Sequence, residues 1–160
     1  KSQAALEFLT TYAWAFLVIL IMVGALAYFG VLRPSKLLPD RCNFGSEIDC
    51  SDFRITYGTG SNGAVNLRLK NSVGEAITVN SVTLTTEGAS GNYCTAQPTV
   101  TNPWIAGDVI DLSGSGCNAD NVGFVAGDKA KVLVKILYYA TKSGSTYEHE
   151  VSGEIFTTVT

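Results

Sequence analysis

The hydrophobic and polar positions divide the chain into two parts with different periods. The run from Phe8 to Leu32 contains no charged residue, and apolar residues occupy every face of it. This pattern predicts a helix that is buried all round rather than an amphipathic one. At the rise of an α-helix the run spans roughly 37 Å, somewhat more than the hydrocarbon core of a bilayer. We expect one continuous helix that ends near Leu32, because Pro34 disfavours helical geometry at Arg33.

After this run the period changes to the alternation that is typical of strands. The stretches "FRITY", "VNLRLK" and "TYEHEV" each alternate apolar or aromatic residues with polar ones. In "AITVNSVTLTT" the parity changes at Asn80 and Ser81, which predicts a bulge or a bend. The most apolar stretch, "KVLVKILYYA", is expected to lie centrally in a sheet. The stretch "GEIFTTVT" is expected to form the last strand, paired with residues 146–151 or with their neighbour.

The spacing of these strands and of the glycine-rich turns between them predicts an α+β chain. About six to eight short strands with such turns favour an immunoglobulin-like antiparallel β-sandwich. We therefore expect a hydrophobic helix over residues 1–33, a neck over 34–52 and a β-sandwich head domain over 53–160. Two prolines make the neck semi-rigid. The similar stretches "IAGDVIDL" and "VAGDKAKV" are interpreted as turns that enter strands, because two copies do not make a repeat protein.

The cysteines indicate an oxidising compartment. The chain has four of them, an even number, which favours a disulfide framework. A metal site is less favoured, because the spacings contain no Cys-x-x-Cys and His149 is the only histidine. Four cysteines allow three connectivities. The local choice joins Cys42 to Cys50, beside the neck, and Cys94 to Cys117, and the other two connectivities remain open.

Charge and motifs exclude several classes of function. The net charge is -3, from 11 basic and 14 acidic residues, and no basic block is present, so nucleic-acid binding is not indicated. The stretch "GTGSNG" at Gly58 to Gly63 matches the pattern G-x-G-x-x-G. A dinucleotide site requires a helix directly after that pattern, whereas "AVNLRLK" alternates as a strand. We interpret Gly58–Gly63 as a hairpin loop.

No residue pattern indicates catalysis. His149 lies between two glutamates and is not accompanied by a G-x-S-x-G elbow, so a structural role is favoured. A group of acids lacks the spacing of a calcium-binding loop and is interpreted as solvated charge: Asp40, Glu47, Asp49 and Asp52. We expect a protein that is not an enzyme and has no cofactor and no metal site.

The first residues, "KSQAALEFLTTYAW", place one acid at the head of the apolar run. Burying a lone carboxylate such as that of Glu7 costs free energy. One interpretation is that Glu7 pairs with an amino group at the start of a neighbouring subunit, so that its burial is tolerated only in the correct register. The alternative is an acid in the first helical turn that complements the helix dipole in the headgroup region.

The stretch from Lys1 to Glu7 resembles the class III signal-peptide junction of archaeal type IV pilins and related filament subunits. That junction has a basic residue, a small residue and Gln, then Glu at the fifth position, and an apolar helix follows. Glu7 is fifth when Gln3 is counted as first. Ser2 stands where glycine is usual, and Ala5 stands where serine is frequent. The resemblance implies processing by a prepilin peptidase between Ser2 and Gln3, so the chain, which retains Lys1 and Ser2, either was cut upstream or does not start at the processed terminus.

The resemblance also implies how the chain is used. Subunits would reside transiently in the cytoplasmic membrane, and an assembly ATPase and membrane platform would build them into an extracellular homopolymer. The helices would pack in the filament core, with Glu7 and Gln3 as assembly residues, and the β domain would be exposed for adhesion or surface contact. Two alternatives are a membrane-anchored monomeric surface binding protein and an archaellin-type motility filament subunit. A cleaved secretory leader is not favoured, because the apolar run continues into "RPSKLLPD" without a small-residue cleavage site.

Overall fold

The computed structural model of the chain describes residues 2–30 and 34–160. Lys1 of the junction motif and Leu32, near which we expected the helix to end, therefore lie outside the described residues. The chain divides into two compact units, Lys1–Leu38 and Pro39–Thr160, which are described separately.

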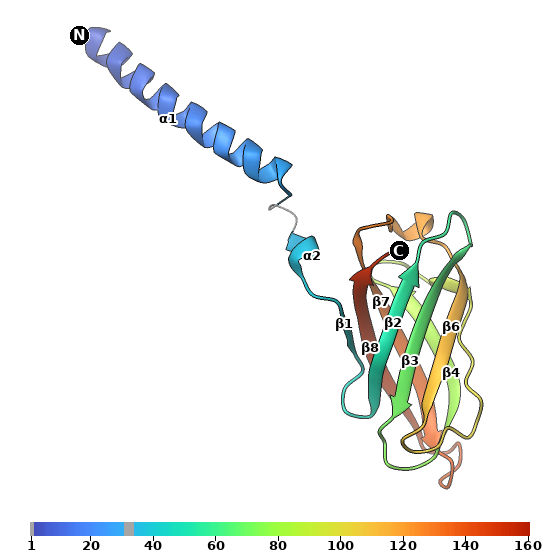
Figure 1. The fold of residues 1–160 in the computed structure, drawn as a ribbon. Coiled ribbons are helices and arrows are strands. Elements are labelled where there is room, and N and C mark those ends of the chain that lie inside the picture. The colour runs from blue at the N-terminus through green and yellow to red at the C-terminus, as the bar shows by residue number, and fades with distance from the viewer. Residues whose placement is uncertain (1, 31–33) are drawn as a thin grey trace. The chain divides into compact units, whose positions relative to one another are not determined.

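The first unit contains the helices α1 (Ser2–Tyr28) and α2 (Pro34–Leu37) (Figure 1). None of the residues of α1 is buried. The helix ends earlier than the position near Leu32 that we expected. Gly30 has a φ of 72°, and its amide donates a hydrogen bond to the carbonyl of Ala27 at 3.1 Å. A left-handed glycine of this kind commonly ends a helix, so this local signal overrides the apolar length of the run.

The second unit contains two antiparallel four-stranded sheets (Figure 1). Their strands are β1 (Arg41–Asn43), β2 (Ile48–Thr56), β3 (Gly63–Asn71), β4 (Ile77–Thr86), β5 (Cys94–Ala96), β6 (Val109–Cys117), β7 (Lys129–Ala140) and β8 (Glu148–Thr158), with a 3-10 helix η1 (Asp120–Val122). The orders are β1-β8-β7-β4 in the first sheet and β2-β3-β6-β5 in the second. Strand structure thus begins at Arg41, inside the segment 34–52 that the sequence pattern assigns to a neck.

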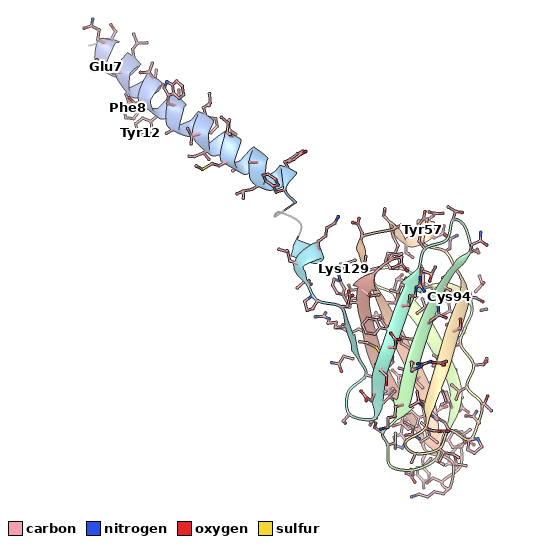
Figure 2. The ribbon with its side chains drawn as sticks, viewed as in Figure 1. Glu7, Phe8, Tyr12, Tyr57, Cys94 and Lys129 are labelled. Atoms are coloured by element: carbon pink, nitrogen blue, oxygen red, sulfur yellow. A yellow bond between two sulfur atoms is a disulfide. The ribbon has the colours of Figure 1, made fainter. Side chains whose placement is uncertain are left out.

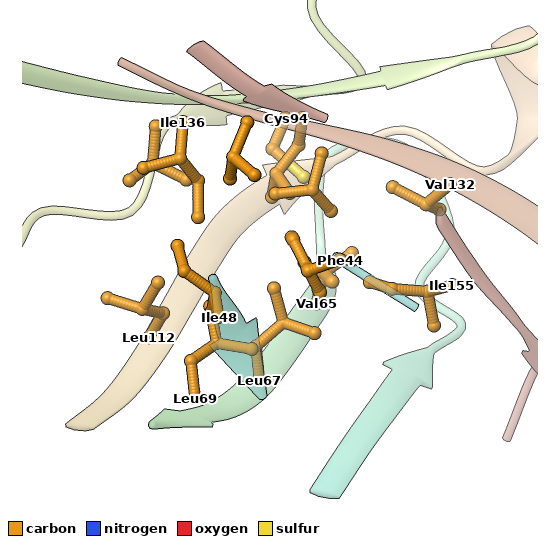
Figure 3. Packing of buried hydrophobic residues seen from close by; sticks show 14 of the residues in the cluster. Phe44, Ile48, Val65, Leu67, Leu69, Cys94, Leu112, Val132, Ile136 and Ile155 are labelled. Carbon is orange, nitrogen blue, oxygen red and sulfur yellow. The ribbon is translucent and has the colours of Figure 1, made fainter. Parts of the chain in front are cut away.

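Both sheets contribute to one hydrophobic core, shown in Figure 3. In β3 the residues alternate strictly between buried and exposed or half-buried positions, as expected for an antiparallel sheet with one face on a core. Core residues from the two sheets include Val65, Leu67, Leu69 and Leu112 of the second and Val132, Ile136 and Ile155 of the first. The chain is therefore α+β, with an apolar N-terminal helix followed by two sheets.

Two strand predictions are confirmed and one is wrong. The register of β4 against β7 shifts between Val79 and Ser81, and β7 lies centrally, between β8 and β4. However, "GEIFTTVT" does not form a strand separate from residues 146–151, because Glu148–Thr158 is one continuous strand. Gly153 marks a close approach rather than a turn: a Cβ atom placed on it would lie 2.3 Å from Cδ1 of Phe44.

The two "AGD" stretches form similar turns, as predicted. Gly107 has a φ of 80° and Gly127 a φ of 85°, and the amides of the following aspartates, Asp108 and Asp128, each donate to a carbonyl three residues earlier at 3.1 Å. These turns lead into β6 and β7.

Candidate assembly site

The surface of α1 is apolar along its whole length. The helix has 27 residues, or about 40 Å, and is long and apolar enough to cross a membrane. Figure 2 shows its side chains projecting from the ribbon, and Trp14 and Tyr28 are 71% and 87% exposed. Removing each large apolar side chain from water is worth about 1.5–3 kcal/mol. Lipid or other protein must therefore cover this helix.

The threonine hydroxyls of α1 find their partners within the helix. The Thr10 hydroxyl donates to the carbonyls of Leu6 and Glu7, each at 3.0 Å, and the Thr11 hydroxyl donates to that of Glu7 at 2.9 Å. Such bonds to preceding carbonyls satisfy a hydroxyl without an external partner. Within residues 2–30 and 34–160, by contrast, no hydrogen bond or ion pair of the Glu7 carboxylate is formed. Glu7 therefore carries a charge that α1 itself does not compensate.

Glu7 lies beyond the first turn of α1. The helix begins at Ser2, and its first turn contains no acidic residue. Since the effect of the helix dipole falls off within the first turn, the dipole alternative is less favoured for Glu7 in this helix. Gln3 lies four residues before Glu7, so the two predicted assembly residues are neighbours on one helix face. Both are exposed, as is Ser2 of the predicted processing site.

Two further features of the α1 surface concern an aromatic pair and a glycine. The rings of Phe8 and Tyr12 lie beside each other on one face, with centroids 4.3 Å apart (Figure 2). A Cβ atom on Gly24 would meet nothing within 4 Å. Packing within the chain therefore does not require glycine there, while the missing side chain permits another helix backbone to approach closely.

Ionic contacts hold the start of the second unit to the first sheet. The Lys129 ammonium, whose side chain is only 11% exposed, donates a hydrogen bond to Asp40 Oδ1. This bond holds the pKa of the Asp40 carboxyl below its usual value. Arg41 Nη2 lies 2.9 Å from Glu154 Oε1, and its guanidinium lies over the ring of Phe156, 5.5 Å from the centroid. Because β1 is only three residues long, these side chains extend its attachment beyond the ladder hydrogen bonds.

The four cysteines form the two local disulfides that the sequence favours. Cys42 is bonded to Cys50, and Cys94 to Cys117. The first bond joins β1 to β2 and thus links the two sheets. The second joins directly opposed residues of β5 and β6 and lies in the core, where Cys94 is labelled in Figure 2. Disulfides and an apolar N-terminal helix together indicate a protein that is not cytoplasmic.

The loop Gly58–Gly63 joins β2 to β3, which confirms the hairpin interpretation. Asp120 of η1 holds this loop: its carboxylate accepts hydrogen bonds from the Tyr57 hydroxyl at 3.0 Å and from the Gly60 amide at 3.1 Å. The same contact raises the pKa of Tyr57, because an anionic partner opposes ionisation of the phenol. These bonds give the loop a structural role.

The acids that we interpreted as solvated charge are only partly so. Asp40 pairs with Lys129, and Glu47 Oε2 accepts a hydrogen bond from the Tyr138 hydroxyl at 3.1 Å. Asp49 and Asp52 are exposed. Within the described part of the chain no group of acids, histidine and cysteines is arranged to hold a metal ion. The His149 ring lies 5.7 Å from that of Tyr138, centroid to centroid.

An open hollow of about 590 Å³ lies over the outer face of the second sheet, a feature that the sequence did not reveal. Across it Arg68 donates to both carboxylate oxygens of Asp111, at 2.7 and 2.9 Å. This pairing lowers the pKa of Asp111 and raises that of Arg68. The two side chains are far apart in sequence and meet only through the β3–β6 register. Since they neutralise each other, the pair offers no net charge to a ligand.

Comparison with known proteins finds no family model that matches the chain and no characterised protein that matches its sequence.

Proposed function

We propose that this protein is a structural, non-enzymatic subunit of an extracellular filament of the archaeal type IV pilus kind. In this proposal α1 packs with α1 of other copies in the filament core, and the sheets are exposed for adhesion or surface contact. The observation that carries the proposal is α1 itself, a long apolar helix with no buried residue and one uncompensated carboxylate in its second turn. A neighbouring subunit supplies both the missing apolar cover and a partner for Glu7.

The second candidate is a monomeric surface protein that is anchored by α1. The hydrophobic effect scarcely separates the two candidates, because lipid tails are as apolar as leucine, and packing and polar contacts must decide. An anchor concentrates Trp and Tyr at the two membrane interfaces. In α1 the aromatic residues lie at positions 8, 12, 14, 16 and 28, and Trp14 lies near the middle of the helix. That distribution favours a packed protein core. An archaellin-type motility filament shares this layout and is a third candidate.

Membrane insertion precedes assembly in this proposal. The resemblance of the first seven residues to the class III junction supports cleavage by a prepilin peptidase before Gln3, followed by assembly by an ATPase and membrane platform. We also infer that the second unit is an immunoglobulin-like sandwich. Supporting this, its two four-stranded antiparallel sheets share one core, and the chain passes between the sheets repeatedly, as Greek-key sandwiches do.

Microscopy of sheared cells tests the proposal. Appendages removed by shearing are imaged by negative stain, and their protein is identified by mass spectrometry alongside the detergent-extracted membrane fraction. We expect this chain in the sheared filaments, with an N-terminal peptide that begins at Gln3. Recovery of the chain only from the membrane fraction would establish the anchored monomer instead.

A further inference from the structure

We propose that residues 39–50, which we call the joint, are a tension-bearing connection in which the Cys42–Cys50 disulfide makes both sheets resist a pull together. The source of tension rests on the proposed function, since a filament or an anchor holds α1 while the sheets contact a surface. The arrangement of the joint itself does not depend on that function. It follows from the contacts within the second unit.

A pulling force between α1 and the sheets is transmitted through the joint, because the joint connects them along the chain. The second unit begins at Pro39, so a force between α1 and the sheets enters at this residue. The first structure that it meets is β1, a three-residue strand that pairs with β8 from Arg41↔Phe156 to Asn43↔Glu154. Three residues of ladder alone are a weak attachment.

Side chains on either side of β1 reinforce it. Asp40 is paired with Lys129 just before the strand, and Arg41 is paired with Glu154. Directly after the strand, Phe44 is buried to 2% exposure. Its ring lies where a Cβ atom of Gly153 would be. The strand therefore cannot slide along β8 without breaking ion pairs and moving an aromatic ring out of the core.

Through the Cys42–Cys50 disulfide, the second sheet also resists a pull on β1. Cys50 lies in β2, a nine-residue strand that pairs with β3 in the second sheet from Ile48 to Thr56. Without the bond, a pull that freed β1 would next straighten residues 44–47, then load β2 from its first residue, Ile48, and only then reach Cys50. With the bond, Cys50 must move whenever Cys42 moves. The β1–β8 and β2–β3 ladders are thus loaded at the same time and not in sequence.

The direction of the pull makes this loading effective. Because β1 is antiparallel to β8 and pairs near its end, the joint enters at the end of the sheet opposite the β7–β8 turn, as Figure 1 shows. A target held at that turn would pull β8 one way while α1 pulls β1 the other way. The ladder hydrogen bonds then share the load instead of opening one after another.

The bond also shortens the chain that a pull can release. The bridged Cα atoms are 6.0 Å apart and eight positions apart in sequence. A chain segment of this length extends to at most about 27 Å. Breaking the bond therefore adds about 20 Å of extension before Cys50 is loaded.

Single-molecule force spectroscopy on the full chain in detergent tests the proposal. One handle is attached at the N-terminus and the other through a non-natural amino acid at Ser145, an exposed residue of the β7–β8 turn. We expect Cys42→Ser/Cys50→Ser to show an early event of about 20 Å at a force lower than the first rupture of the wild type. The matched control, Cys94→Ser/Cys117→Ser, should lack this early event, because its bond joins strands within one sheet.

A second measurement avoids any folding defect of the serine variants. The wild-type chain is pulled, reduced under mild conditions, pulled again, reoxidised and pulled a third time, and the early event should appear only in the reduced state. An unchanged first rupture in reduced chain and in Cys42→Ser/Cys50→Ser would overturn the proposal. Since a single chain is pulled, that result would not contradict the filament proposal. Failure to find filaments would not contradict the proposed mechanical role of the joint.

Discussion

The contact between Gly153 and Phe44 predicts a large effect from a single methyl group. A Cβ atom at position 153 would lie 2.3–2.5 Å from three ring atoms of Phe44, far inside the contact distance of about 3.5–4.0 Å. The ring is buried in the core, since Phe44 is only 2% exposed. Forcing extra atoms into a packed core costs about 1–3 kcal/mol. We expect Gly153→Ala to lie at the upper end, about 3 kcal/mol, because the obstacle is a whole ring.

Thermal unfolding of the full chain, followed by near-UV circular dichroism, measures this cost. For a domain of this size 1 kcal/mol corresponds to roughly 4 °C in Tm, so Gly153→Ala should lower Tm by about 10 °C. Adding Phe44→Leu should restore part of the loss by making room, which is a non-additive interaction of about 0.5–3 kcal/mol. Ser152→Ala, at the exposed neighbouring position, should change stability by less than about 0.5 kcal/mol. A wild-type Tm for Gly153→Ala, or a double variant that loses the sum of both single effects, would refute the reasoning.

Two further predictions concern Tyr138 and the disulfides. Burial, reinforced by the hydrogen bond to Glu47, raises the pKa of Tyr138 to about 12 from its usual 10.0. The folded state thus holds the phenol proton more tightly than the unfolded state does. The resulting stabilisation of the folded state is complete below pH 10 and is lost as the pH rises to about 12. The stability of the wild type relative to Tyr138→Phe should fall by up to about 2–3 kcal/mol over that interval, and Tm differences that do not change with pH would contradict this. Dithiothreitol should reduce Cys42–Cys50 before Cys94–Cys117 in the folded chain, because Cys94 and Cys117 are 0% exposed and exchange requires access to sulfur. Alkylation and mass spectrometry give the order, and simultaneous reduction would show that burial does not protect the second bond.

Local patterns predicted those parts of the fold that depend on which side of a strand is buried. Alternation located the long strands, and the change of parity at Asn80 and Ser81 located the bulge in β4. Continuous apolarity marked β7 as a central strand. Each of these signals is contained in about ten neighbouring residues, and each reports burial directly.

The parts that sequence missed depend on distant partners. β1 is too short to alternate, and β8 and the Cys42–Cys50 disulfide hold it in place. At Gly153, nothing nearby in sequence reveals the ring of Phe44. The ion pair between Asp40 and Lys129 joins residues 89 apart, and no spacing rule predicts such a pair. Register, which decides these contacts, is fixed only when the whole sheet has formed.

The candidate assembly site stays a prediction, and it rests on a lone charge in an apolar helix, which is visible in the sequence without any partner. The structure sharpens it by separating Glu7 from the other polar groups of α1. Thr10 and Thr11 already bond to carbonyls of their own helix, whereas the Glu7 carboxylate has no such partner among the described residues. For the proposed assembly we therefore expect a directing contact from Glu7 rather than from the two hydroxyls.

This difference predicts opposite results for two changes that lie within one turn of each other. Glu7→Gln keeps size and hydrogen-bonding capacity but removes the charge, and charge-assisted bonds are roughly twice as strong as neutral ones. A loss of about 1–2 kcal/mol at each subunit contact lowers its association constant about 5- to 30-fold, so filament yield per cell should fall sharply while the membrane-fraction subunit stays constant. Thr10→Val/Thr11→Val, the matched control, removes only hydroxyls that are satisfied within the helix, and filaments should persist. Equal yields from Glu7→Gln and wild type would mean that apolar packing alone selects the register of the helices and that Glu7 has no part in it. An equal loss from the threonine variant would mean that the loss is not specific to the charge of Glu7.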